Sequence, residues 1–140
     1  MVNRFDPGGL DMELFQVAQH ATDLERAADF YARLLQLDPA AVFDPPGLVF
    51  FQLGPVRLLI DRGAPSALLY LRVPDVRATI ERLRSEGVEV VSEPHVIFSH
   101  SDDTLGPAGT DEVMAFIKDS EANTVGLLSH HPPTEPAENG

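Results

Sequence analysis

Hydrophobic and polar residues alternate in some segments of this chain and recur every three or four residues in others. Residues 14–21, LFQVAQHA, alternate as a half-buried β-strand does. The next segment, 23–37, carries apolar residues spaced four, three and four apart, at Leu24, Ala28, Tyr31 and Leu35. This spacing predicts an amphipathic helix with one apolar stripe. The Thr-x-x-Glu pattern of Thr22 and Glu25 predicts where that helix starts.

Two more strands are predicted in the first half of the chain. After a proline-containing connection, residues 48–53 and 56–60 read LVFFQL and VRLLI, which are rich in β-branched and other large apolar side chains. Gly54 and Pro55 between them predict a tight two-residue turn. We therefore expect the two segments to form an antiparallel hairpin.

The second half of the chain shows the same order of elements. Residues 67–73, ALLYLRV, predict a strand, and the helix that follows begins at the N-cap Asp75 and ends at Gly87. Further strand segments are predicted at 88–91, 95–98 and 111–130, the last with a polar turn at 119–123.

The two halves align when one is shifted by the 52 positions that separate Asp23 from Asp75. The helical stripes then coincide, with Leu24 on Val76, Ala28 on Ile80 and Tyr31 on Leu83. Chance alignment of two amphipathic helices would not also bring the neighbouring strands into the same order. We infer a duplicated unit within one α+β domain, with modules at about 13–62 and 67–129 and tails at 1–12 and 130–140.

Composition and charge exclude several classes of protein. The 140 residues suffice for one buried core. Because neither a span of roughly 20 apolar residues nor a secretion signal is present, we expect a cytoplasmic protein without membrane contact. The net charge of -12 disfavours nucleic acid, whose phosphates require clustered Lys and Arg. The absence of cysteine excludes disulfides, thiolate metal sites and cysteine nucleophiles.

Four segments of the sequence resemble a known superfamily. They are VAQHATDLERAADFYARLL, the hairpin ending in VRLLID, the second copy LLYLRVPDV and the closing AFIKDSEANTVGLL. Roughly residues 13–129 resemble the vicinal oxygen chelate superfamily, which includes glyoxalase I, extradiol dioxygenases and bleomycin-resistance proteins. The resemblance implies tandem βαβββ modules that form a curved mixed sheet shaped as a cup, and often a homodimer.

Metal-dependent members of that superfamily hold a divalent ion with one side chain, typically His or Glu, from each of four strands. The resemblance carries these positions onto Gln16, Arg57, Leu68 and Gly126. Leu68 and Gly126 offer no donor atom, and the guanidinium of Arg57 is permanently positive. Gln16 alone cannot hold an ion. We therefore expect neither a metal ion nor another cofactor.

The same four positions mark the face of the sheet that would line the cleft, and strand alternation with antiparallel pairing extends this face. The deduced ligand-binding residues are Gln16, Phe50, Gln52, Arg57, Leu59, Leu68, Tyr70, Met114, Phe116, Gly126 and Leu128. Phe50, Tyr70 and Phe116 can stack on a flat ring, or they can simply fill the core. Arg57 and Gln52 can hydrogen-bond a carbonyl or acid group. This composition predicts a pocket for a largely apolar, aromatic molecule.

Two histidines of the second half are further candidates. His95 and His100 flank VIFS and precede the Gly-rich, acidic loop SDDTLGPAGTD, so His95, Phe98 and His100 could close over a bound ligand. His100 with Asp102 or Asp103 could instead transfer protons, and His95 and His100 are the candidates for catalysis. A solvated loop without either role is the alternative.

These observations lead to three hypotheses. The first is a metal-independent protein that sequesters a small aromatic or apolar compound, such as an antibiotic, in a homodimer similar to the resistance members of the superfamily. The second is an enzyme of the isomerase, lyase or dioxygenase type that uses the same cup without metal. The third is a metalloenzyme with displaced ligands such as His95, His100 and Asp102.

Overall fold

The computed structural model describes residues 13–133, so most of both expected tails, at 1–12 and 134–140, lies outside the described residues. The helices are α1 (Leu24–Leu35) and α2 (Val76–Ser85). The strands are β1 (Gln16–His20), β2 (Ala41–Phe43), β3 (Leu48–Leu53), β4 (Val56–Asp61), β5 (Leu69–Arg72), β6 (Val90–Ser99), β7 (Asp111–Lys118) and β8 (Thr124–His131). Neither helix in this range has the length and apolar character of a transmembrane span.

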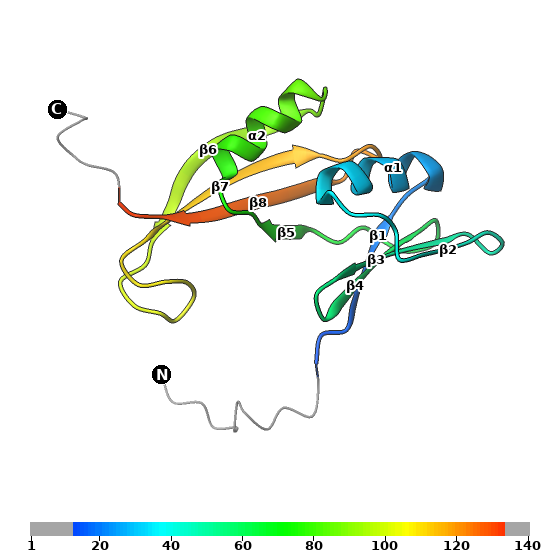
Figure 1. The fold of residues 1–140 in the computed structure, drawn as a ribbon, viewed down its shortest axis with the longest axis horizontal. Helices are drawn as coiled ribbons and strands as arrows, with labels where there is room; N and C mark the ends of the chain where they lie inside the picture. Colours follow the sequence, from blue (N-terminus) through cyan, green and yellow to red (C-terminus); the bar gives the residue numbers. More distant parts are fainter. Residues whose placement is uncertain (1–12, 134–140) are drawn as a thin grey trace.

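Each half of the chain contributes one helix and one four-stranded sheet. The first sheet has the order β1-β4-β3-β2 and the second the order β5-β8-β7-β6. In both sheets the first and last strands of the module pair in parallel, while the other neighbours are antiparallel. Figure 1 shows α1 over the first sheet and α2 over the second, on the same side of the molecule. The α+β class and the tandem βαβββ modules predicted from the sequence are confirmed.

The helix starts differ from the prediction in one detail. The N-cap of α1 is Asp23, not Thr22, because the Asp23 carboxylate accepts the backbone amide of Arg26 at 3.0 Å. The buried face of α1 consists of Leu24, Ala27, Phe30, Tyr31 and Leu34. Ala28 and Leu35 of the predicted stripe are only partly buried, since the face that meets the sheet is centred one position away. Asp75 caps α2 as predicted.

The registers of both hairpins are those deduced from the turns. The predicted partners Gln52 and Arg57, Phe50 and Leu59, Phe116 and Gly126, and Met114 and Leu128 lie opposite one another. β6 is one strand where the sequence suggested two, and its register with β7 shifts between Val90 and Ser92, between Ser92 and His95 on either side of Pro94, and between Val96 and Phe98. Proline has no amide hydrogen for the ladder, so it interrupts the pairing without ending the strand. β2 was not predicted, and β8 reaches His131, two residues into the expected tail.

Both helices pack their apolar faces on the sheets and share one core. Its largest fully buried side chains include Tyr31, Phe51, Leu58, Ile60, Ile80, Leu83, Ile117 and Leu127. Leu58 and Ile60 alternate with residues that remain partly exposed, as expected for strands covered on one face. The sheet faces turned away from the helices are therefore the surfaces available for a ligand.

A buried carboxylate joins the second module to the first. Glu121, in the turn between β7 and β8, accepts the backbone amides of Thr22 and Asp23 at 3.0 and 3.1 Å, and its side chain is only 2% exposed. The guanidinium of Arg26 donates to the same carboxylate at 2.7 and 3.1 Å. The hydrogen bond from Arg26 is the main reason why the pKa of Glu121 falls to about 2. In Figure 1 this turn ends beside α1.

A second polar contact crosses the same boundary. The buried hydroxyl of Tyr31 donates to Asp119 Oδ2 at 2.7 Å and accepts from Gln19 Nε2 at 3.1 Å. Burial raises the pKa of the Tyr31 phenol, so the hydroxyl keeps the proton that it donates. Asn123 Nδ2 adds a bond to the carbonyl of His20 at 2.9 Å. The two modules are therefore held by directional bonds as well as by apolar packing.

The first prediction concerns Glu121. At neutral pH, replacement by Gln should lower the free energy of unfolding by about 1–3 kcal/mol, because the Arg26 charge and two amides lose their ionised partner. A folded-state pKa of about 2 against 4.5 in the unfolded chain means that this stability is present above pH 4.5 and is lost as the pH falls toward 2. Urea unfolding of both proteins at several pH values should show the difference shrinking over that interval.

Asp29→Asn is the matched control, because Asp29 is an exposed acid on the solvent side of α1. Its effect should stay within about 0.5 kcal/mol at every pH. Equal stability of wild type and the Glu121 variant at neutral pH would contradict the role assigned to this carboxylate.

Candidate functional site

An arginine on the open face of the first sheet is held in place by three neighbours. Arg57 on β4 lies opposite Gln16 on β1, and its Nε and Nη2 atoms donate to Gln16 Oε1 at 3.0 and 2.6 Å. Its Cζ atom lies 4.5 Å from the ring centroid of Phe15 and 5.1 Å from that of Phe50. We call these four residues the arginine cluster. Its guanidinium is oriented by an amide oxygen and lies within cation–π distance of two aromatic rings.

One predicted residue of this region has a further contact, and another residue was missed. Gln52 Nε2 donates to the carbonyl of Gly54 at 2.7 Å, which closes the β3–β4 turn, and its role as a ligand anchor stays a prediction. Phe15 was missed, because strand alternation assigns the neighbour of Gln16 to the opposite face. Alternation does not apply to Phe15, since β1 begins at Gln16.

A tyrosine occupies the corresponding place on the second sheet. Tyr70 on β5 lies opposite Gly126 on β8, and its ring meets Phe116 edge to face with centroids 6.0 Å apart. A Cβ atom at Gly126 would lie 2.7 Å from Tyr70 Cδ1 and 3.1 Å from Phe116 Cε1. Because Gly126 has no side chain, the rings of Tyr70 and Phe116 can both lie against the backbone of β8 at this point. We call Tyr70, Phe116 and Gly126 the tyrosine cluster.

The remaining predicted residues of the second module are distributed as follows. Leu68 is exposed and comes just before β5, so the residue opposite Gly126 is Tyr70. Met114 is buried between its cross-strand partners His95 and Leu128.

The two groups of predicted residues belong to two separate sheets. Those of the first sheet are Gln16, Phe50, Gln52, Arg57 and Leu59. Those on or next to the second sheet are Leu68, Tyr70, His95, Phe98, Met114, Phe116, Gly126 and Leu128. A single cleft lined by both groups stays a prediction.

His100 has a different partner from the one expected. It was paired in prediction with Asp102 or Asp103, but those carboxylates accept backbone amides of their own loop. His100 Nε2 instead lies 2.9 Å from Glu112 Oε1. Asp102 and Asp103 accept hydrogen bonds from amides of their own loop. Glu112 comes from the next strand, β7, and its carboxylate lies beside His100. Of the suggested metal ligands His95, His100 and Asp102, only His100 belongs to the group of side chains in the described residues that could hold a metal ion.

Glu112 and His130 are the polar residues that sequence reasoning missed. His130 Nε2 lies 3.2 Å from the same Glu112 Oε1, and its ring centroid is 5.2 Å from that of His100. The strand segment predicted at 111–130 contains both residues, and the register of the β7–β8 hairpin, continued to its open end, places Glu112 opposite His130. We call His100, Glu112 and His130 the histidine cluster.

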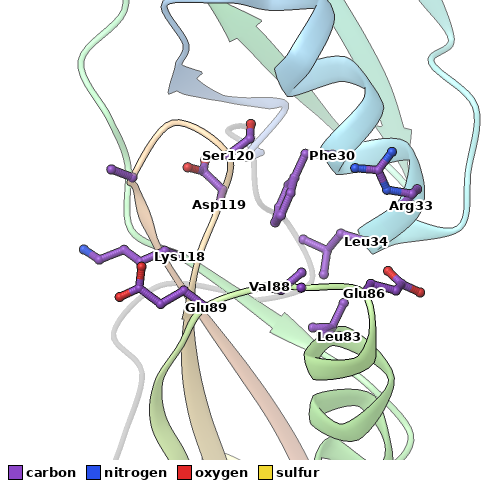
Figure 2. Close-up of a pocket in the computed structure, with 12 residues that line it drawn as sticks. Phe30, Arg33, Leu34, Leu83, Glu86, Val88, Glu89, Lys118, Asp119 and Ser120 are labelled. Atoms are coloured by element: carbon purple, nitrogen blue, oxygen red, sulfur yellow. The ribbon is translucent and has the colours of Figure 1, made fainter.

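A cavity of about 400 Å³ lies on the helical side of the molecule (Figure 2). Phe30 and Leu34 of α1 and Leu83 of α2 point into it, and charged side chains stand at its border. Asp119 lines it too, but both of its oxygens accept hydrogen bonds from neighbouring groups. The cavity lies between the two modules, and none of the predicted ligand-binding residues lines it.

Comparison with known proteins identifies the family and the fold. The family model described as Glyoxalase/Bleomycin resistance protein/Dioxygenase superfamily matches residues 13–127. The structure of TnmS3, an antibiotic binding protein from Streptomyces sp. CB03234, has a TM-score of 0.68 and 22% identity, covering 86% of this chain and 97% of that chain. Lactoylglutathione lyase from Agrobacterium tumefaciens has a TM-score of 0.59 and 20% identity over 84% and 92% of the two chains. Among curated protein sequences, none matches this chain significantly.

The side chains at the four positions that the resemblance assigns to a metal do not fit a divalent ion. Gln16 Oε1, the one side-chain oxygen among them, already accepts two hydrogen bonds from Arg57. Arg57 brings a fixed positive charge to the point where a cation would sit. Leu68 and Gly126 supply no donor atom.

A second prediction tests the close approach at Gly126. Gly126→Ala should destabilise the protein by about 1 kcal/mol or more, because the new methyl group overlaps Tyr70 and Phe116. Tyr70→Ala in the same chain should recover most of this loss, since it removes the nearest ring. The measurement is urea unfolding of the two single variants and the double variant. Gly63→Ala is the matched control, because the nearest atom there is 3.8 Å away. Additive losses in the double variant would speak against this packing.

Proposed function

The chain belongs to the Glyoxalase/Bleomycin resistance protein/Dioxygenase superfamily, and on that premise we propose that it binds and sequesters a small aromatic or largely apolar compound. Antibiotics are the class we expect. Binding takes place on the sheet faces turned away from the helices, and it needs no metal ion at the family's position. Capture without conversion requires affinity alone, which a surface of aromatic rings with one fixed polar anchor supplies.

The arginine cluster is the observation that carries this proposal. A guanidinium has five N–H donors, and two of those of Arg57 bond to Gln16. The rest can hold a carbonyl or carboxylate of a ligand. Phe15 and Phe50 fix the guanidinium in one orientation, so little conformational entropy is lost on binding. The cluster therefore serves as a preorganised polar anchor beside apolar surface.

The tyrosine cluster supports the proposal from the second sheet. Tyr70 is 52% exposed while its ring packs edge to face on Phe116. A flat ligand ring can lie on the exposed part of this pair. TnmS3, which shares the fold, is named as an antibiotic binding protein. Together with the arginine cluster, Tyr70 favours a ligand that is aromatic and carries an oxygen acceptor.

We also propose that two copies of the chain associate. Several large apolar side chains are about half exposed or more in the single chain: Leu14, Phe15, Val42, Phe43, Leu68, Tyr70, Val91, Phe98 and Leu105. Large exposed apolar patches on a single chain mark interaction surfaces. A second copy of the chain would cover part of this surface and would convert the open sheet faces into walls of a cleft.

The third prediction tests binding. Planar polycyclic aromatic compounds that carry a ketone or carboxyl group should bind in calorimetric titrations, and their saturated analogues should not. Arg57→Gln and Tyr70→Ala should each weaken binding by at least about tenfold, because each removes a central contact. Arg77→Gln, on the exposed surface of α2, is the control and should bind as the wild type does.

Analysis of the recovered ligand separates the two function classes. Sequestration predicts that chromatography after prolonged incubation returns the compound unchanged. A product formed in excess over protein would instead support the enzyme hypothesis, with His95 as the exposed acid-base candidate. Failure of every aromatic compound to bind would contradict the proposal.

The fourth prediction concerns assembly. Sedimentation equilibrium should give twice the chain mass of 15.3 kDa. Phe98→Glu, which places a charge on the exposed apolar surface, should shift the mass toward that of one chain. A wild-type protein that sediments as a single chain at all concentrations would refute the dimer.

A further inference from the structure

We propose that His100, Glu112 and His130 bind one divalent transition-metal ion, such as zinc, at the end of the second sheet. This histidine cluster shares no residue with the family's four metal positions. It is also separate from the arginine and tyrosine clusters, so the inference goes beyond the proposed ligand binding and does not rest on it.

Three neighbouring strands bring the ligands together. Glu112 on β7 lies directly opposite His130 on β8. His100 follows β6, whose last residue Ser99 pairs with Asp111. One ligand atom from each of the three side chains lies within 4.8 Å of the other two. Glu112 and His130 are held by strands, and the backbone amide of His100 donates to the carbonyl of Thr110 at 2.8 Å, which favours a preformed site.

The distances and the types of ligand suit a metal ion. Glu112 Oε1 lies 2.9 Å from His100 Nε2 and 3.2 Å from His130 Nε2. Around a tetrahedral zinc ion with bonds of about 2.0–2.2 Å, neighbouring ligand atoms are roughly 3.3–3.5 Å apart. The observed spacing is shorter by a few tenths of an ångström. Two histidines and one carboxylate are a known zinc set and also suit iron(II).

The cluster is also largely removed from solvent. The side chains of His100, His130 and Glu112 are 2%, 13% and 16% exposed. Removing two imidazoles and a carboxylate from water has a desolvation cost. Such groups are buried where a favourable interaction among them or with a metal ion offsets that cost. A metal ion provides that interaction, once each Nε2 atom has lost its hydrogen and each proton has moved to Nδ1 or to solvent.

A glycine leaves the space that the ion needs. A Cβ atom at Gly106 would lie 2.8 Å from His100 Nε2 and 2.9 Å from His130 Nε2. Gly106 does not have a positive φ angle, so space rather than backbone conformation demands glycine here. The loop is tied to the same place by the Gly109 amide, which donates to the His100 carbonyl at 2.8 Å. A bound ion would therefore hold this loop against the sheet.

An opening to solvent lies beside the cluster. His130 lines a cavity of about 430 Å³ together with Arg72, Val73, Pro74 and Pro107. An ion can enter by this route, and a water molecule or a small anion can complete its coordination. Arg72 in the same cavity favours an anion at that fourth position.

Zinc itself is the probe for the test. The full chain without an affinity tag, dialysed against a chelator, is titrated with zinc chloride by calorimetry. We expect one ion per chain. Glu112→Gln and His130→Asn should each weaken binding by more than about 100-fold, the upper end of what loss of an outer-sphere partner costs. Asp111→Asn, which removes the same charge from the neighbouring residue, and His20→Asn should bind zinc as the wild type does.

Two further measurements keep the outcome clear if a ligand variant folds poorly. Cobalt(II) in place of zinc should give visible absorption bands typical of a four-coordinate nitrogen and oxygen site. Gly106→Ala should weaken zinc binding while its far-ultraviolet circular dichroism stays that of the wild type. Absence of stoichiometric zinc binding to the wild type, or equal losses in the ligand and control variants, would overturn the proposal. Arg57→Gln should leave zinc binding unchanged, so failure of the ligand proposal does not affect this test.

Discussion

The structure depends on the buried contact between the β7–β8 turn and the first helix. Glu121 accepts two amides at the start of α1 and the guanidinium of Arg26, and Asp119 accepts the buried hydroxyl of Tyr31. A carboxylate removed from water is stable only with such partners, so the turn can dock in one way. This contact sets the position of the second module relative to the first. It thereby decides how all the surfaces of the two sheets are arranged.

Because both helices lie on one side, the two sheets have their opposite faces free for other tasks. The duplicated modules use the equivalent pair of parallel strands differently. In the first module the pair β1 and β4 carries the charged arginine cluster, whereas in the second the pair β5 and β8 carries the tyrosine cluster. The two modules therefore keep the same strand order but differ in the side chains at these strand pairs. The histidine cluster adds a distinct chemistry at the far end of β8.

Much of the fold could be predicted from local patterns. The two-residue turn at Gly54 and Pro55 sets the register of its hairpin, and the same argument holds for the turn after Lys118. Prediction was weaker where pairing overrides local signals. The segments predicted at 88–91 and 95–98 belong to one strand, β6, which continues through Pro94 because β7 supplies partners on both sides. The alternation of side chains along the strands predicted part of the candidate site. It could not predict Phe15, because Phe15 comes just before β1, where the alternation does not apply.

The sequence by itself determined the duplicated βαβββ order, the helix cap at Asp75 and the absence of carboxylate and imidazole side chains at the four positions that the resemblance assigns to a metal. These features follow from residue type and from spacing along the chain. Only the tertiary structure decided that Arg57 is clamped by Gln16 and two rings, that Gln52 closes a turn, and that Glu112 joins His100 and His130. Each of these depends on atoms brought together from distant segments. Their distances are set by packing and hydrogen bonding across strands, and no local pattern encodes them.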